Sequence, residues 1–132
     1  MKITYSYYEY NILDKVASET MKLLTTIIRP NILQEVREPL LAIGVSGLTV
    51  TEVRGYGRQQ GHTELYRGAE YRVSFVPKIK LEIALDDALL DQAIEVVSGV
   101  AKTGRFGDGK LFISELDQIL RLRTGESCVF AL

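Results

Sequence analysis

The sequence predicts a ferredoxin-like fold: an α/β (or α+β) double β-α-β sandwich with both helices on one face of the sheet. Three observations predict it: a strand-helix-strand pattern over residues 21–53, a second one over residues 78–123, and a polar segment between them too irregular to form an element. Two tandem β-α-β units are typical of that fold.

The first half opens with a predicted strand at residues 21–29, which is rich in Leu, Ile and Thr and ends before Pro30, a residue that cannot donate to a β-ladder. Asn31 is the expected N-cap of the following helix, whose apolar residues recur at helical spacing up to Gly44, the expected stop. Residues 48–53 alternate and are rich in β-branched side chains, as a half-buried strand requires.

The second half begins with the clearest strand signal of the chain, because charged and apolar side chains alternate without interruption over residues 78–83. Asp86 and Asp87 offer caps to a helix with one apolar face. The chain resumes as a strand at residues 111–113, and residues 119–123 are predicted to form a last short strand.

Composition limits the class of protein. A chain of 132 residues that is 46% hydrophobic fits one domain with one core. Its 16 basic and 17 acidic residues nearly cancel, so charge alone recruits neither nucleic acid nor an anionic membrane. Cys128 is the only cysteine, which argues against a disulfide or a structural zinc site. No apolar run fits a signal peptide or a membrane span, so the cytoplasm is the expected location.

Residues 104–110, Gly-Arg-Phe-Gly-Asp-Gly-Lys, match the phosphate-loop pattern G-x-x-x-x-G-K, but Leu111 replaces the hydroxyl residue that would hold magnesium. The segment also leaves a helix and enters a strand, so no helix N-terminus points at a ligand. Its glycines can still expose N–H groups as an anion nest, and its lysine adds a charge. Two interpretations stay open: a phosphate site, or a helix C-cap followed by a tight turn.

Two further charged groups also have two interpretations each. Arg121 and Arg123, on one side of the last predicted strand, either complete a cationic cradle for a polyphosphate or form a solvated edge. Lys78 and Lys80, alongside Glu82, form either a ligand site or an exposed ladder. Spacing alone favours the solvated edge and the exposed ladder.

Two rival functions can be weighed on the same residues. A small nucleotide-binding phosphotransfer enzyme or hydrolase would need a base or nucleophile near the γ-phosphate, and His62, the only histidine, lacks orienting partners. An RNA-recognition domain shares the predicted sheet, but residues 111–113 supply only one aromatic side chain.

Three motifs occur in a fixed order. Residues 47–71 run from Gly-Leu-Thr-Val-Thr-Glu-Val to Gly-Tyr-Gly-Arg-Gln-Gln-Gly-His-Thr-Glu-Leu-Tyr-Arg-Gly-Ala-Glu-Tyr; residues 103–110 add Thr before the glycine-rich segment; residues 121–126 read Arg-Leu-Arg-Thr-Gly-Glu. They resemble, in turn, the T-loop, the B-loop and the C-terminal R-x-R-T-G-E motif of the PII nitrogen-regulatory signalling proteins (GlnK/GlnB-like). The resemblance implies one domain over residues 21–132, with the T-loop at about residues 55–74. Residues 1–20 are then an extension, either disordered or the product of a mis-assigned start.

The resemblance implies a regulatory protein rather than an enzyme, with at most incidental slow ATP hydrolysis. It implies a homotrimer whose clefts between subunits bind ATP or ADP, with Arg121 and Arg123 reaching the phosphates from the neighbouring subunit. The nucleotide-binding residues that it implies are Gly47, Leu48, Thr49, Gly57, Arg58, Gln59, Glu82, Gly107, Asp108, Gly109, Lys110, Arg121 and Arg123.

The resemblance also implies an effector site for 2-oxoglutarate beside the nucleotide. Its residues would be Gln59, Gln60, Gly61 and Lys78, with Gln59 bridging Mg²⁺ and 2-oxoglutarate. The chemistry agrees, since a dicarboxylate beside a triphosphate needs a metal and a lysine to offset repulsion.

Two residues of the T-loop are implied to meet partner proteins. Tyr71 falls at the position of the family's modified tyrosine, which implies a uridylyl- or adenylyltransferase. Arg67 falls where a GlnK-like protein inserts an arginine into an ammonium transporter. The implied partners are therefore such a transporter or enzymes of nitrogen metabolism, with no nucleic acid, and the implied location is the cytoplasm with membrane association through the transporter.

Overall fold

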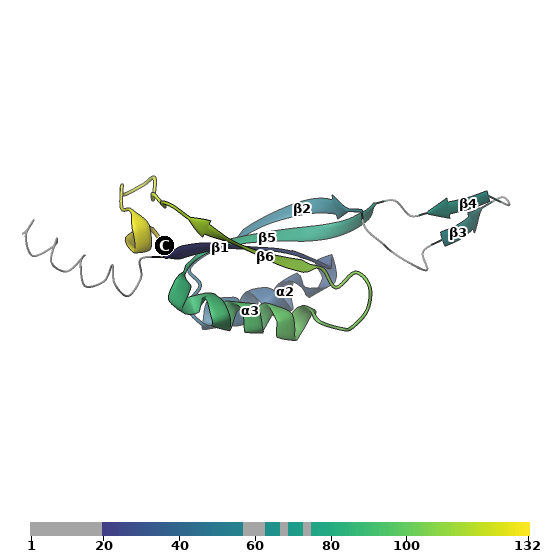
Figure 1. Cartoon of the computed structure of the whole chain (residues 1–132), viewed down its shortest axis with the longest axis horizontal. Helices are drawn as coiled ribbons and strands as arrows, with labels where there is room; N and C mark the ends of the chain where they lie inside the picture. Colours follow the sequence, from purple (N-terminus) through teal and green to yellow (C-terminus); the bar gives the residue numbers. More distant parts are fainter. Residues whose placement is uncertain (1–19, 57–62, 67–68, 73–74) are drawn as a thin grey trace, which may run out of the picture.

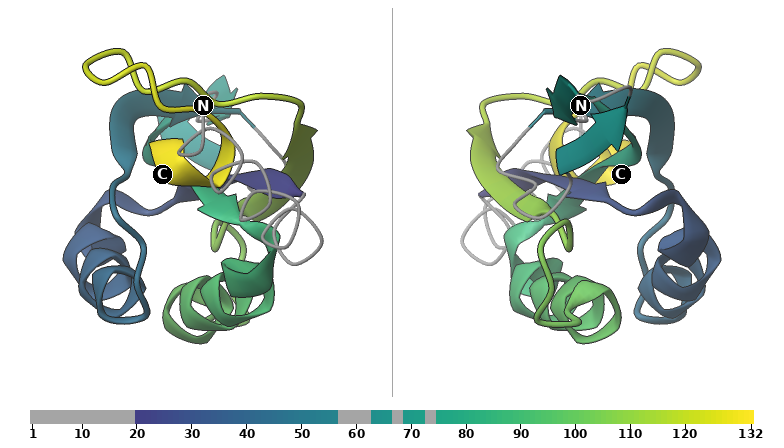
Figure 2. Two further views of the ribbon diagram at one scale, coloured as in Figure 1. Left: turned by 90° about the vertical axis from the view of Figure 1, so that its left-hand side faces the viewer. Right: turned by 90° about the vertical axis from the view of Figure 1, so that its right-hand side faces the viewer.

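The structure, a computed structural model, describes residues 20–56, 63–66, 69–72 and 75–132. Four antiparallel strands form one sheet in the order β2-β5-β1-β6 (Figure 1): β1 (Met21–Ile28), β2 (Thr49–Gly55), β5 (Val76–Asp86) and β6 (Lys110–Leu116). Both long helices, α2 (Leu33–Ala42) and α3 (Asp87–Ala101), lie side by side on one face of this sheet (Figure 2). The predicted ferredoxin-like double β-α-β sandwich is confirmed.

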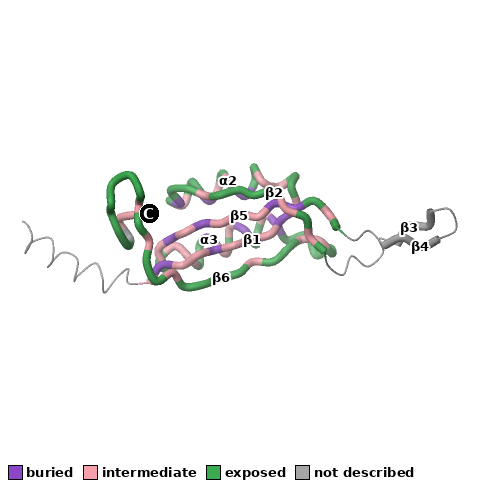
Figure 3. The backbone as a smooth tube through the Cα atoms, turned by 90° about the horizontal axis from the view of Figure 1, so that it is seen from above, coloured by how far each residue is buried: buried purple, intermediate pink, exposed green. Residues whose placement is uncertain are grey.

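The hydrophobic core lies between the sheet and the helices. Side chains of a strand alternate between its two faces, so every second residue from Leu24 to Ile28 of β1 and from Ile79 to Leu85 of β5 is buried (Figure 3). The residues of the core without exposed surface come from both central strands and both helices: Leu24, Ile28, Leu81, Ile83, Val36, Leu40 and Ala93. Their burial provides the main driving force for this packing.

The other side of the sheet, called the open face below, carries polar residues. Cross-strand pairing aligns Thr49 of β2 with Glu82 of β5, and Glu82 with Thr25 of β1. Two residues farther along β5 toward residue 76, Lys80 pairs with Thr51. A band of polar residues therefore crosses β2, β5 and β1 on the open face.

The helix boundaries differ from the prediction at one cap. Asn31 is not an N-cap, because Pro30 starts a short 3₁₀ turn, η1 (Pro30–Ile32), and α2 follows without a side-chain cap. The predicted end at Gly44 is confirmed by its φ of +108°. Asp86 is the N-cap of α3 as predicted, and its carboxylate accepts a hydrogen bond of 3.0 Å from the Ala88 N–H.

The last predicted strand is wrong. β6 ends at Leu116, and residues 119–123 form no strand; a single bridge joins Leu120 to Ser127. Gly125, at a φ of +73°, closes a turn in which its N–H donates to the Arg121 carbonyl at 2.8 Å. The chain ends in a second 3₁₀ turn, η2 (Cys128–Ala131).

The sequence had indicated that the segment between the two halves is too irregular to form an element, but part of it is regular. Two short strands, β3 (Thr63–Tyr66) and β4 (Ala69–Arg72), pair antiparallel in a sheet of their own. The sequence of each contains an aromatic or β-branched residue, which favours extended backbone. Among the described residues, no helix is both long and apolar enough to span a membrane.

Candidate functional site

The glycine-rich segment forms the loop between α3 and β6 (the α3–β6 loop, residues 102–109), and Asp108 closes it. The Asp108 carboxylate accepts hydrogen bonds from the backbone N–H groups of Thr103 at 2.7 Å and Gly104 at 2.8 Å, and from the Thr103 hydroxyl. These donors hold the pKa of Asp108 well below its usual range, the Thr103 hydroxyl contributing most. Beyond a helix cap and a tight turn, the loop is therefore also closed by hydrogen bonds to one of its own side chains.

Arg29 crosses from the end of β1 to this loop. Its Nη1 lies 2.5 Å from the Asp108 carboxylate, and its Nη2 donates to the Phe106 carbonyl at 2.9 Å. Arg29 was not among the residues predicted from the sequence. Only the strand pairing of Ile27 with Lys110 would have pointed to Arg29, because this pairing places the residue just beyond β1 beside the loop that precedes Lys110.

Lys78 reaches the same loop from β5. Its ammonium donates to the Gly107 carbonyl at 2.7 Å, and the residue is only 7% exposed. Burial lowers the pKa of Lys78, the Arg29 charge lowers it further, and Asp108 offsets part of this effect. The exposed-ladder interpretation, which spacing favoured, is therefore wrong for Lys78, although Lys80 and Glu82 do pair at the surface with 3.7 Å between their charged atoms.

Two glycines of the loop have φ angles in the left-handed region, which favours glycine. Gly109 has a φ of +105°, and a Cβ there would lie 1.7 Å from the Ile27 carbonyl oxygen, so a side chain would displace the loop. Gly107 has a φ of +94°, and a Cβ there would be in ordinary van der Waals contact, at 3.4 Å, with both the Arg29 Nη2 and the Lys78 Nζ.

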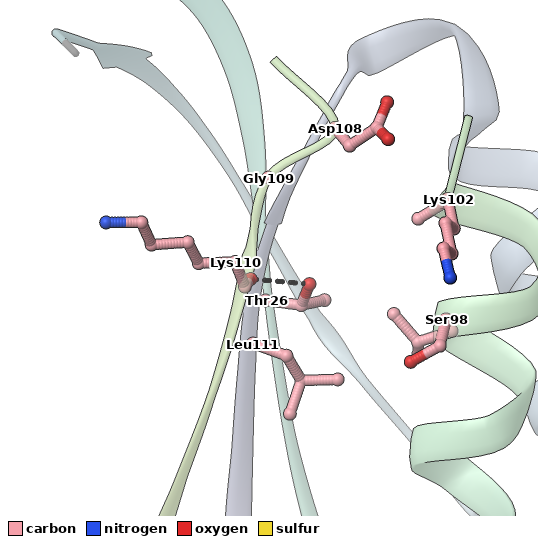
Figure 4. A pocket seen from close by; sticks show the side chains of 9 residues that line it. Thr26, Ser98, Lys102, Asp108, Gly109, Lys110 and Leu111 are labelled. Atoms are coloured by element: carbon pink, nitrogen blue, oxygen red, sulfur yellow. Dashed lines mark hydrogen bonds between the residues drawn. The ribbon is translucent and has the colours of Figure 1, made fainter. Parts of the chain in front are cut away.

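Behind the loop lies an open hollow of about 280 Å³ between the end of α3 and the start of β6. Figure 4 shows Ser98 of α3 and Lys102, the residue just after α3, on one side of it and Thr26 and Leu111 on the other, while the Lys110 side chain points away from it. Lys110 lies on the open face, since it pairs with Ile27 and Ile27 pairs with Lys80.

The residues expected around the nucleoside lie farther along the open face. Thr49 and Glu82 are direct cross-strand partners, and Gly47 and Leu48 immediately precede β2. Val53, four residues after Thr49, pairs with Lys78, so the Thr49–Glu82 pair lies about 13 Å from Lys78 along the sheet.

The two arginines near the C-terminus do not meet the loop within one chain. Residues 121 and 123 follow the far end of β6, and Figure 1 shows the C-terminal segment at the opposite end of the sheet from the α3–β6 loop. Arg121 donates to the main-chain oxygen of Leu132 at 2.6 Å and lies 3.6 Å from the Glu126 carboxylate. The expected cationic cradle is therefore incomplete in a single chain.

Several predicted site residues lie outside the described residues: Gly57, Arg58, Gln59, Gln60, Gly61, His62 and Arg67. Tyr71 belongs to β4, of which only the backbone is described. Within the described ranges, no three His, Cys, Asp or Glu side chains gather where a metal ion could bind.

Comparison with known proteins decides the family. The family model of the nitrogen regulatory protein P-II matches residues 21–126. The chain belongs to the P-II family. It is 57% identical over 112 residues to the nitrogen regulatory protein GlnK of Escherichia coli K12, which covers 85% of this chain and 100% of that relative.

Other P-II relatives agree. The nitrogen regulatory protein P-II of Rhizobium etli is 59% identical over 107 residues, which cover 81% of this chain and 96% of the relative. A solved structure of a Bacillus subtilis GlnK–ATP complex superposes with a TM-score of 0.72 at 32% identity, over 87% of this chain and 98% of that one. This P-II chain is accordingly a nitrogen signal-transduction protein, with a regulatory rather than an enzymatic role.

Proposed function

We propose that the chain senses ATP or ADP together with 2-oxoglutarate and passes their state to partner proteins through residues 55–74. The observation that carries the nucleotide assignment is the α3–β6 loop, a closed glycine-rich loop in contact with Arg29 and Lys78 and followed by Lys110. Against these three cations the loop contains one carboxylate, that of Asp108, which accepts hydrogen bonds from Arg29, Thr103 and Gly104. A polyphosphate suits such an excess of positive charge. The Bacillus subtilis relative was solved as a complex with ATP, which supports the same choice.

The nucleotide site would be shared between subunits of a homotrimer. Within one chain, Arg121 and Arg123 lie beyond the end of β6 that is farther from the loop. β6 has seven residues and is thus about 20 Å long. Only a second copy can bring these arginines to the phosphates, with Thr49 and Glu82 near the nucleoside.

The 2-oxoglutarate site would use Lys78, which lies about 13 Å from the nucleoside residues and beside the loop. Arg29 adds a second cation there, as a dicarboxylate requires. Mg²⁺ prefers oxygen ligands, so the phosphates, 2-oxoglutarate and Gln59 would hold it, and its charge would offset the repulsion between the two anions.

The output would pass through the T-loop. ATP with 2-oxoglutarate would favour one loop conformation and ADP another, and each ligand can shift the balance only by its differential affinity. Partners would be an ammonium transporter, contacted through Arg67, or enzymes of nitrogen metabolism, with Tyr71 as a target of a uridylyl- or adenylyltransferase. The protein would act in the cytoplasm and at the membrane through the transporter.

Calorimetry on the full chain tests this proposal. We expect heat on adding ATP or ADP, and 2-oxoglutarate binding that depends on Mg²⁺ and ATP. If neither nucleotide gives heat or a thermal shift, the nucleotide assignment is wrong. If 2-oxoglutarate binds equally well with and without ATP, the coupling is wrong.

A further inference from the structure

The geometry points to Arg29 and Lys78 as positioning residues of the phosphate loop, which turn the N–H groups of Gly107 and Asp108 outward before any effector binds. This inference rests on the proposed nucleotide site and deepens it. It gives Lys78 a task in nucleotide binding that is separate from a contact with 2-oxoglutarate.

The two cations donate hydrogen bonds to successive carbonyls of the loop. The Arg29 Nη2 binds the Phe106 carbonyl at 2.9 Å, and the Lys78 Nζ binds the Gly107 carbonyl at 2.7 Å. In a planar trans peptide, the carbonyl of one residue and the N–H of the next point in opposite directions, and the described residues contain no cis peptide. The N–H groups of Gly107 and Asp108 therefore point away from Arg29 and Lys78.

These two N–H groups are available to a ligand. Among the described residues, no backbone or side-chain oxygen accepts a hydrogen bond from the Gly107 or the Asp108 N–H. Successive free N–H groups in a glycine-rich turn form a nest for an anion. The loop thus presents donors on one side because its acceptors are held on the other.

Asp108 would act on a phosphate through its backbone and through Arg29, not through its carboxylate. Thr103, Gly104 and Arg29 all donate to that carboxylate. A free carboxylate beside a phosphate would repel it, whereas this one is engaged and fixes the guanidinium against the loop. Asp108 is therefore a third positioning residue, which acts through Arg29.

Glycine at position 107 fits this arrangement. The direction in which a Cβ would project is filled by both cations, each 3.4 Å away. At its φ of +94° a residue with a side chain would be strained, so glycine allows the loop to adopt this turn beside Arg29 and Lys78. Lys78 donates to a neutral carbonyl, and the Asp108 carboxylate offsets only part of the effect of burial and of the Arg29 charge, so an arriving anion would add a counterion that the loop itself lacks.

The test compares Lys78→Met with Lys80→Met on the same strand and the same face, where Lys80 touches Glu82 and not the loop. ADP and adenosine affinities are measured by calorimetry without 2-oxoglutarate and Mg²⁺. We expect Lys78→Met to weaken ADP binding about tenfold or more, with adenosine binding unchanged, and Lys80→Met to stay within about twofold for both. The assigned ¹H–¹⁵N resonances of Gly107 and Asp108 in the ligand-free protein should shift in Lys78→Met alone.

A second pair of variants covers the case in which Lys78→Met does not fold. Arg29→Gln should produce the same ADP-specific loss, and Arg54→Gln, an exposed site on β2, should not. The inference would be wrong if the wild type binds ADP but Lys78→Met and Lys80→Met have the same ADP affinity. It would also be wrong if the Gly107 and Asp108 resonances do not shift in Lys78→Met. Either result would leave the proposed function standing. Absence of ADP binding in the wild type would overturn both.

Discussion

Two loops follow the two helices at equivalent places in the duplicated fold, and they are held by different forces. The α2–β2 loop (residues 43–48) is closed by its own backbone: the Gly44 N–H donates to the Leu41 carbonyl at 3.2 Å, and the Val45 N–H to the Leu40 carbonyl at 3.1 Å. This is a Schellman motif, and its apolar residue, Val45, is buried in the core at 4% exposure.

The α3–β6 loop has no such anchor, since its one large apolar residue, Phe106, is 69% exposed. Side chains from other elements hold it instead: Arg29, Lys78 and its own Asp108. The position of a loop that is held by apolar burial does not depend on ions, whereas the position of a loop that is held by charged side chains changes when an anion binds. The difference indicates that the α3–β6 loop, and not the α2–β2 loop, is suited to bind an anion.

The strongest test of this comparison is Gly109→Ala, because a Cβ at that position would overlap the Ile27 carbonyl. We expect the β1–β6 pairing to be disrupted and the free energy of unfolding in urea to fall by on the order of 4 kcal/mol. Gly99→Ala is the matched control. Gly99 lies within α3 with open space around it, so alanine should stabilise the protein by about 0.5–1 kcal/mol. Equal effects of the two variants would contradict the close approach.

Val45→Ala separates the two kinds of anchor. Removing two buried methyl groups from the core should lower the free energy of unfolding by about 2 kcal/mol. ADP affinity at a temperature where the variant is folded should stay unchanged, because the α3–β6 loop makes no use of Val45. A parallel loss of ADP affinity would mean that both loops serve the site.

Much of this fold follows from local patterns in the sequence. Alternation in residues 78–83 predicted the inner part of β5. Asp86 was one of two aspartates expected to cap α3, and its carboxylate accepts a hydrogen bond from the N–H two residues away. The last strand failed because residues 121–126 carry a turn closed by Gly125, which outweighs the extended pattern before it.

Local sequence patterns predict less of the site than of the fold. The glycine-rich segment was identified as a candidate phosphate site, with a helix C-cap and tight turn as the alternative, but Arg29 and Asp108 are 79 residues apart, so no local pattern joins them. Lys78 was misread because alternation gives the face of a strand, not what covers it. Knowledge of the strand pairing was needed for both residues.

Asp108→Asn tests, through the pH dependence of stability, whether the Asp108 carboxylate closes the α3–β6 loop. The folded-state pKa of Asp108 is depressed, so its carboxylate contributes stability that is present above the ordinary aspartate pKa of about 4 and is lost as pH falls toward the folded value. The wild type should therefore melt at a higher temperature than Asp108→Asn at pH 7, and the gap should narrow as pH is lowered from about 5 to 3. Thermal melts across this range measure it, and a gap independent of pH would exclude the carboxylate as the closing group.

The smallest effect is expected at Lys80, two residues from Lys78 on the same strand face. The Lys80–Glu82 pair is 3.7 Å apart with both side chains about one-third exposed (37% and 34%). Ion pairs of this kind are screened by water and salt, so Lys80→Met should change the free energy of unfolding by less than about 0.5 kcal/mol, and less still in 1 M NaCl. Urea titrations at two salt concentrations measure this change. A loss above about 1.5 kcal/mol would show that Lys80, like Lys78, is held by structure beyond its own strand face.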